Sequence, residues 1–173
     1  MIEKLKVLWA KYREVLMYLI FGVMTTFVGW GVYYAVLLSG RAIFDIPVEE
    51  TASVRYFALY TAAQIIQWVC AVLFAFFTNR AWVFTDADRS EGTMGRQLVL
   101  FAGSRVASLG LDIAVTYGLT LLLALWITTP PVLLGVSLTP GIIAKVVAAA
   151  LVIVANYVLS KIFVFKSKKK DRA

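Results

Sequence analysis

The sequence contains no histidine and a single cysteine, Cys70, and these two shortages exclude several kinds of site. One cysteine cannot form a disulfide within the chain, so a disulfide framework is excluded. Zinc centres built from histidine or paired cysteines are excluded as well, and we expect neither a metal nor a cofactor. Cys70 lies inside an apolar run, where we expect a small packing residue.

Charge is also scarce, since 16% of the residues are charged and 61% are hydrophobic. Soluble domains have about a quarter of their residues charged. The charges are clustered and leave long uncharged runs, so the composition indicates an integral membrane protein. We expect no cleavable signal peptide, because charges continue through Glu14 with no small-residue cleavage site.

Four segments are long and apolar enough to cross the hydrocarbon core, which takes about 20 residues of helix. A short amphipathic helix is expected before them, from Leu5 to Val15 within residues 1–15, because apolar and basic residues alternate there at helical spacing. The predicted spans are Leu16 to Leu38, Tyr56 to Thr78, Leu98 to Trp126 and Ile142 to Phe163.

Lysine and arginine are distributed unequally between the two ends of these spans. Thirteen lie before the first span, between the second and third, or from Lys161 onward, whereas the other two loops contain only Arg41 and Arg55. The positive-inside rule then predicts that both termini lie in the cytoplasm. A basic run beside an apolar segment is typical of a membrane helix, and we expect no nucleic-acid partner.

The endings of the second and fourth spans resemble one another. "RAWVF" begins at Arg80 and "KIFVF" begins at Lys161, 81 residues later, and the same offset aligns Gly22 with Gly103 and Gly29 with Gly110. We interpret this as a parallel duplication of a two-span hairpin, with chance similarity as the alternative. The predicted fold is all-α, a single membrane domain over 1–173, with hairpins at 16–84 and 97–165 and a basic tail at 166–173.

Three ionisable residues, Arg105, Asp112 and Lys145, lie within the predicted spans. A charge near the helix centre costs about 2.5–3.5 kcal/mol, so such residues face a partner, a cavity or a substrate. Because spans three and four run in opposite directions, we expect Lys145 at the depth of Asp112, and Asn156 at the depth of Arg105. The hypothesis is a polar track in which each of these two pairs interacts; the alternative is that Asp112 merely neutralises a cation and holds the helices together.

Four segments of the sequence, in this order, resemble the GtrA-like family: "GVMTTFVGW", "FAFFTNRAWVF", "FAGSRVASLGLDIAV" and "NYVLSKIFVF". The resemblance covers about Tyr18 to Phe165. It implies a role in cell-envelope polysaccharide synthesis or glycosylation, by flipping a polyprenyl-phosphate-linked sugar such as undecaprenyl-phosphate-glucose across the cytoplasmic membrane. It also implies a possible family-2 glycosyltransferase partner. The chain has no glycosyltransferase motif of its own, so we expect no enzyme activity.

For such a substrate, cations suit the phosphate, and amides and carboxylates suit sugar hydroxyls. Interface anchoring explains Arg80 and Lys161 equally well, and interhelical hydrogen bonding explains Gln64 and Gln67 equally well. The candidate phosphate-binding residues are Arg105, Lys145, Arg80 and Lys161, and the candidate polar-track residues are Asp112, Asn156, Asn79, Gln64 and Gln67.

Two other functions compete with flipping. The chain could be a membrane scaffold that orients a glycosyltransferase and transports nothing. A small multidrug exporter also has four spans, but it needs an acidic residue in the first, and Leu16 to Leu38 contains none. Four helices are few to enclose a headgroup, and the glycines offer contact faces, so we expect a homo-oligomer.

Overall fold

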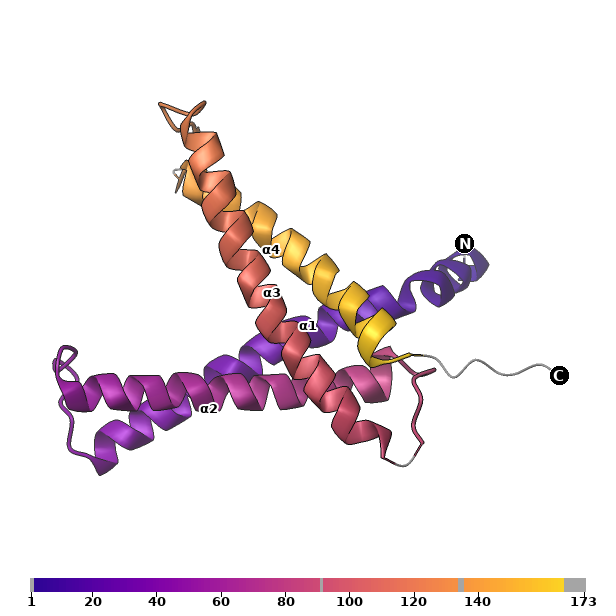
Figure 1. The fold of residues 1–173 in the computed structure, drawn as a ribbon, viewed down its shortest axis with the longest axis horizontal. Coiled ribbons are helices and arrows are strands. Elements are labelled where there is room, and N and C mark those ends of the chain that lie inside the picture. Colours follow the sequence, from indigo (N-terminus) through magenta and orange to yellow (C-terminus); the bar gives the residue numbers. More distant parts are fainter. Residues whose placement is uncertain (1, 91, 134–135, 167–173) are drawn as a thin grey trace. The chain divides into compact units, whose positions relative to one another are not determined.

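The computed structural model describes residues 2–90, 92–133 and 136–166 and contains four long helices (Figure 1). They are α1 (Ile2–Ile43), α2 (Val54–Thr78), α3 (Thr93–Ala124) and α4 (Pro140–Leu159). All four are long and apolar enough to cross a membrane, as predicted. The basic residues of the tail from Lys168 onward fall outside the described residues.

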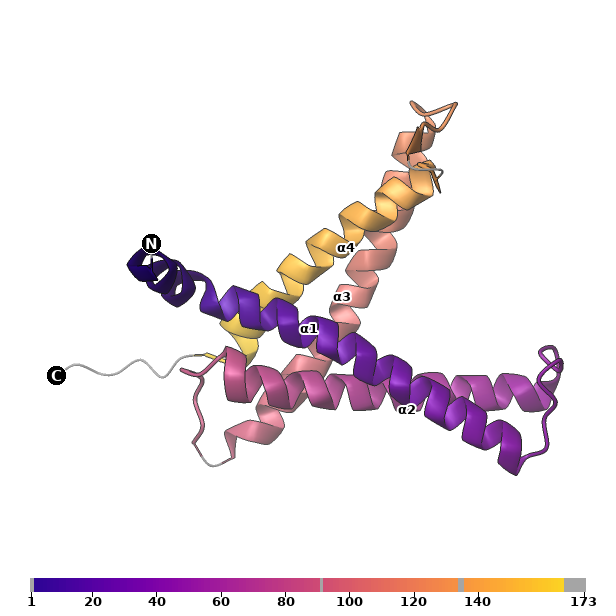
Figure 2. The same cartoon turned by 180° about the vertical axis from the view of Figure 1, so that it is seen from behind.

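The chain divides into two compact units, Met1–Thr85 and Asp86–Ala173, and each contains one predicted hairpin. Within the first unit α1 packs along α2, and within the second α3 packs along α4. The views in Figures 1 and 2 show each pair side by side.

The segment predicted as a short amphipathic helix leading into the first span is the beginning of α1. The helix runs unbroken from Ile2–Ile43. No glycine or proline interrupts the sequence before Gly22, and the charged residues of this segment are good helix formers. The prediction of a helix in this segment is therefore confirmed, and the helix continues without a break into the first span.

The loop that joins α1 to α2 is fixed by a small apolar cluster and by arginine. Leu37 and Leu59 are buried in this cluster together with Ile46 from the loop. Arg41 donates to the carbonyl of Pro47 and places its guanidinium 4.6 Å from the centre of the Tyr56 ring. The chain turn is thus held by side chains from both helices.

The loop that joins α3 to α4 contains a short antiparallel pairing that the sequence did not predict. Strand β1 (Val132–Leu133) pairs with β2 (Val136–Ser137). After it, the hydroxyl of Thr139 accepts a hydrogen bond of 3.3 Å from the amide of Ile142, and Pro140 stands in the first turn of α4. This is a favourable helix start, because proline has no amide to leave unsatisfied there.

Both even-numbered helices end in a single π-helical turn. These turns are η1 (Asn79–Val83) and η2 (Ser160–Val164), and they begin 81 residues apart. The amide of Phe84 bonds the carbonyl of Asn79, and the amide of Phe165 bonds that of Ser160, each at 2.8 Å. The offset found in the sequence therefore aligns two turns of the same type, and the duplication stays an interpretation.

In each repeated ending, one aromatic side chain is buried in its unit and another is exposed. Phe84 and Phe165 are 5% and 3% exposed, whereas Trp82 and Phe163 are 52% and 57% exposed. In each unit the π-turn packs against the first helix of its pair. An extra residue in the turn thus changes which side chains of the repeated ending face the helical pair.

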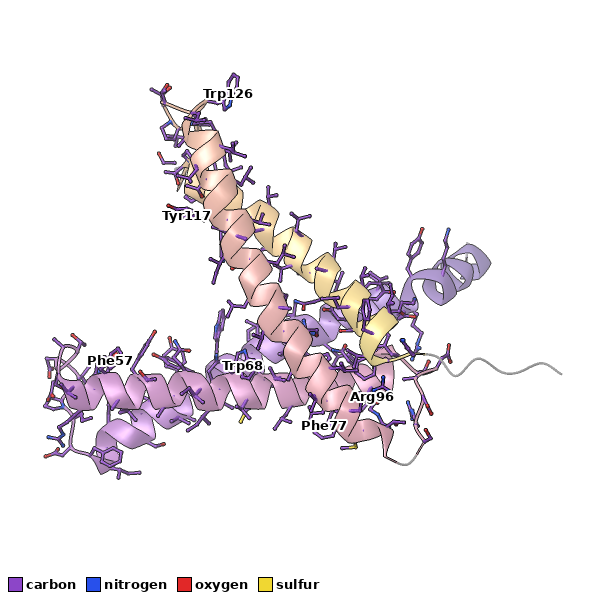
Figure 3. The ribbon with its side chains drawn as sticks, viewed as in Figure 1. Phe57, Trp68, Phe77, Arg96, Tyr117 and Trp126 are labelled. Atoms are coloured by element: carbon purple, nitrogen blue, oxygen red, sulfur yellow. The ribbon has the colours of Figure 1, made fainter. Side chains whose placement is uncertain are left out.

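Large apolar side chains also project along both helical pairs, among them Phe57, Trp68 and Tyr117 (Figure 3). A soluble protein rarely exposes contiguous apolar surface of this kind. A bilayer accepts it, because lipid tails are as apolar as these side chains.

Candidate functional site

Asp112 on α3 and Lys145 on α4 form an ion pair inside the second unit. The ammonium nitrogen of Lys145 lies 2.5 Å from Oδ2 of Asp112. The Lys145 side chain is 59% exposed, while that of Asp112 is only 19% exposed. The predicted pairing is confirmed, and the cation is the partner that reaches the surface of the helical pair.

Lys145 keeps binding capacity beyond this pair. An ammonium group has three donors, and one is bonded to the carboxylate. A phosphate oxygen could accept from the others without displacing Asp112. The ion pair thus reduces the cost of placing a lysine in an apolar span while leaving an accessible cation.

Arg105 lies two helical turns before Asp112 on α3 and is half-buried. Its guanidinium carbon lies 4.6 Å from the centre of the Phe101 ring. The predicted hydrogen bond to Asn156 is wrong, because the side-chain oxygen of Asn156 accepts none from any described residue. The sequence placed Arg105 and Asn156 at a similar depth in the membrane. The guanidinium of Arg105 instead lies over the ring of Phe101, one turn earlier on its own helix.

Four buried side-chain oxygens have no hydrogen-bond partner among the described residues. One belongs to Thr116 on α3, and the other three lie at the ends of the even-numbered helices. They belong to Asn156 and Ser160 in the second unit and to Asn79 in the first. Asn156 and Ser160 are one helical turn apart, and Asn79 and Ser160 each begin a π-turn. An unmatched buried oxygen costs about 1–3 kcal/mol, so these positions are candidates for binding a donor from a ligand.

Arg80 and Lys161 each occupy the second position of a π-turn. Arg80 is half-buried and Lys161 is exposed. The ammonium of Lys161 lies 3.2 Å from the hydroxyl of Tyr157, one turn earlier on α4. Beside Arg80, Trp82 stacks on Phe21 of α1 with ring centres 5.3 Å apart. The neighbouring aromatics are therefore arranged as expected for the ends of membrane spans.

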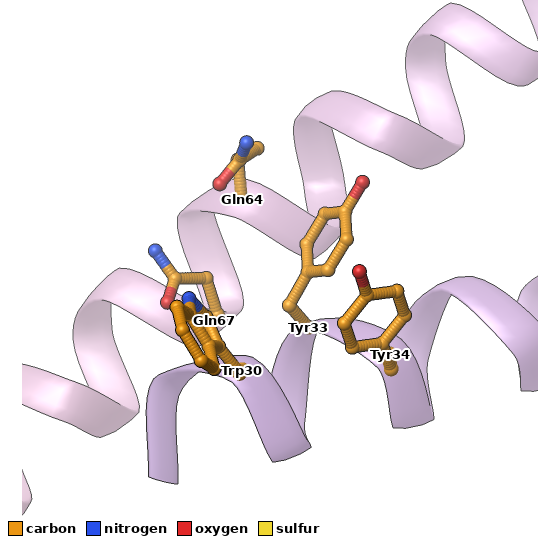
Figure 4. Close-up of a pocket in the computed structure, with 5 residues that line it drawn as sticks. All are labelled: Trp30, Tyr33, Tyr34, Gln64 and Gln67. Carbon is orange, nitrogen blue, oxygen red and sulfur yellow. The ribbon is translucent and has the colours of Figure 1, made fainter. Parts of the chain in front are cut away.

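Gln64 and Gln67 on α2 line a groove with three aromatic residues of α1, which sequence reasoning did not select. The groove has a volume of about 400 Å³ and is lined by Trp30, Tyr33, Tyr34, Gln64 and Gln67 (Figure 4). We call it the Trp30 groove. Aromatic residues at helical spacing usually pack a core, and only the exposure of Trp30 and Tyr34 distinguishes them here.

The nine predicted residues thus fall into two groups, each within one unit. Gln64, Gln67, Asn79 and Arg80 belong to the first, and Arg105, Asp112, Lys145, Asn156 and Lys161 belong to the second. In the described part of the chain no cluster of three or more Cys, Asp or Glu residues could hold a metal ion.

The sequence has relatives among known proteins. It is 30% identical over 155 residues to the Uncharacterized membrane protein YwcD of Bacillus subtilis (strain 168), an alignment that covers 90% of this chain and 98% of that protein. It is 33% identical over 113 residues to the Cell wall teichoic acid glycosylation protein GtcA of Listeria monocytogenes, which covers 64% of this chain and 66% of that protein. The GtcA protein of Listeria innocua is 30% identical over 110 residues.

No solved structure matches the chain. The family described as GtrA/DPMS, transmembrane domain, matches residues 17–165, which include both π-turns and every candidate site residue. This match bears out the resemblance that the four sequence pieces suggested, and the chain belongs to the GtrA/DPMS transmembrane-domain family.

Proposed function

We propose that this protein moves a polyprenyl-phosphate-linked monosaccharide across the cytoplasmic membrane for the glycosylation or synthesis of a cell-envelope polysaccharide. The observation that carries the proposal is the exposed ammonium of Lys145, bonded to Asp112 between two helices of membrane-spanning length. The Listeria relatives, whose names assign them to teichoic acid glycosylation, support a role in the glycosylation of a cell-envelope polymer.

The charges within the spans of the second unit favour an anionic headgroup. Arg105 and Lys145 are cations, and Asp112, which lies between them in the sequence, is an acid. These three residues together therefore have a net positive charge. A phosphate would neutralise the surplus and accept charge-assisted hydrogen bonds. Because a bare charge in the bilayer is costly, cation and phosphate stabilise one another there.

The neutral part of the headgroup needs a different chemistry. Sugar hydroxyls are donors, and the buried side-chain oxygens of Asn156 and Ser160 accept no hydrogen bond from the residues that the structure describes. The isoprenoid tail can stay in the lipid while only the headgroup passes along polar groups. No bond is made or broken in this process, so we propose that the chain is a transporter and not an enzyme.

Orientation and assembly complete the proposal. Both termini lie in the cytoplasm, so Arg80 and Lys161 meet the substrate at the cytoplasmic end of α2 and α4. The chain forms a homo-oligomer through small residues on open helix faces. A methyl group added at Gly31, Gly103 or Gly110 would have no neighbour within 4 Å in this structure.

Reconstitution tests the proposal against the scaffold alternative. The purified protein is placed in liposomes with a short-chain polyprenyl-phosphate glucose, and the lipid exposed on each side is followed with time. We expect protein-dependent movement that Arg105→Gln and Lys145→Gln reduce at least 10-fold. The matched variants Arg89→Gln, before α3, and Arg96→Gln, in its first turn, should leave the movement unchanged.

The opposite pattern would favour the scaffold. In that case no polyprenyl-phosphate sugar moves, the two intramembrane variants support normal glycosylation in cells, and changes at Arg89, Arg96 or Lys168–Lys170 abolish it. A thermal-unfolding measurement on each variant separates loss of transport from loss of folding.

A further inference from the structure

The Trp30 groove places uncharged polar groups in the apolar part of the first unit. Gln64 and Gln67 lie one turn apart on α2 and line the groove together. Trp30, Tyr33 and Tyr34 line it from α1, and Figure 4 shows their rings on the side that faces the two glutamines. Glutamine is rare in lipid-facing helices, because its amide needs hydrogen-bond partners there.

The glutamines are only partly satisfied by the protein. The amide nitrogen of Gln64 lies 2.9 Å from the hydroxyl of Tyr60. A primary amide has two donors and an acceptor oxygen with two lone pairs, so Gln64 retains further capacity. Gln67 packs against α1, where its oxygen would lie 2.7 Å from a methyl group added at Gly29. Gln64 is thus the adaptable polar group and Gln67 is held in place.

The aromatic side of the groove is open. The Trp30 and Tyr34 side chains are 59% and 56% exposed, and the rings of Tyr33 and Tyr34 meet edge to face with centres 5.1 Å apart. An exposed indole face beside amide groups suits a ligand with one apolar face and a rim of hydroxyls. No lysine, arginine or carboxylate lines this groove, so a phosphate is not its occupant.

The register of the repeat relates the groove to the ion pair of the other unit. Gln64 precedes Lys145 by 81 residues, and Gly31, between the aromatic residues, precedes Asp112 by 81. The position that Lys145 occupies in the second hairpin is thus taken by a neutral amide in the first, and the position of Asp112 is taken by glycine.

We propose that the Trp30 groove is the subsite at which this protein selects its sugar, in which the sugar ring lies against Trp30 and its hydroxyls bond the amide of Gln64. Asn156 and Ser160 of the second unit keep their proposed role as acceptors during passage of the headgroup. The groove's volume of about 400 Å³ is enough for one hexose ring. This inference rests on the proposed function, and it assigns discrimination among headgroups to the first unit.

The test compares two probes on the full-length protein in lipid nanodiscs, farnesyl phosphate and farnesyl-phosphate hexoses (glucose, galactose and N-acetylglucosamine). We expect the wild-type protein to bind at least one hexose form about 10-fold more tightly than farnesyl phosphate. Gln64→Leu and Trp30→Leu should reduce that preference to within about 2-fold and leave the affinity for farnesyl phosphate unchanged. Trp30→Phe, which keeps a ring, should retain most of it.

Two matched variants control for general effects. Thr61→Val removes an exposed polar group one turn away on α2, and Trp68→Leu removes an exposed indole outside the groove; both should keep the full preference. The inference is overturned if the groove variants keep the preference too, or if they weaken both probes equally, as loss of a tail-binding or subunit contact would. Wild-type binding of farnesyl phosphate without any sugar preference overturns the inference alone, whereas binding of neither probe overturns the proposed function as well.

Discussion

Lys145 donates to Asp112 from one helix to its neighbour, and the acid is the better covered of the two partners. Replacing Asp112 with Asn leaves the lysine in an apolar span without its acid, which we expect to cost about 2.5–3.5 kcal/mol of unfolding free energy. Lys145→Met leaves the acid alone and should destabilise similarly. The loss of unfolding free energy in the double variant should be smaller than the sum of the two single losses, by about 1–3 kcal/mol.

Equilibrium unfolding in mixed micelles measures this coupling. Lys161→Met is the control, because Lys161 lies in η2 and donates to the hydroxyl of Tyr157 on α4; combined with Asp112→Asn it should be additive. Additivity of the Asp112 and Lys145 substitutions themselves would show that the pair contributes nothing to folding.

Gly40 and Gly22, both on α1, should respond in opposite ways to alanine. A methyl group at Gly40 would lie 2.2 Å from a terminal carbon of Leu59, which is buried between the two helices of the first unit. We expect Gly40→Ala to destabilise by about 1–3 kcal/mol through overpacking. Gly22→Ala meets nothing within 4 Å and should be neutral or stabilise by up to about 1 kcal/mol.

Melting temperatures in detergent check both substitutions. If overpacking is the cause, shortening the neighbour in Gly40→Ala/Leu59→Val should recover part of the loss. An unchanged melting temperature for Gly40→Ala would mean that Leu59 moves away without cost.

The spans and the ion pair could be predicted from sequence because charge is so scarce. A single acid in the third span leaves few partners for Lys145, and opposite helix directions set its level. The same argument failed for Arg105 and Asn156, because level alone does not fix where a long side chain points. The Phe101 ring, one turn away on the same helix, offered Arg105 a closer contact.

Other features depend on geometry that residue types do not specify. The repeated endings predicted equivalent positions, but nothing in "RAWVF" or "KIFVF" distinguishes a π-turn from an α-turn. Trp30, Tyr33 and Tyr34 could not be separated from the many other aromatic residues until their exposure beside Gln64 was known. The pairing of Val132–Leu133 with Val136–Ser137 lies in a loop whose prolines argue against strands.

The π-turn at the end of α4 predicts unequal roles for two phenylalanines two residues apart. Phe165 is buried against Phe101, with ring centres 5.9 Å apart, and Phe163 faces outward. We expect Phe165→Ala to cost about 3–5 kcal/mol and Phe163→Ala less than about 1 kcal/mol. Unfolding in micelles measures both, and equal losses would argue against the π-turn, since an α-turn rotates these side chains differently.

Ser160 and Ser108 are both buried serines of the second unit, and they differ in one respect. The hydroxyl of Ser108 donates to the carbonyl of Arg105 at 2.9 Å, whereas the hydroxyl of Ser160 has no partner among the described residues. Ser108→Ala removes a hydrogen bond and should destabilise by about 1 kcal/mol, while Ser160→Ala removes an unmatched polar group and should stabilise by about 1 kcal/mol. If Ser160 binds the headgroup, its alanine variant gains stability and loses transport in the same liposomes. Stability and transport that rise or fall together would instead make Ser160 a packing residue and would argue against substrate binding at Asn79 and Asn156 as well.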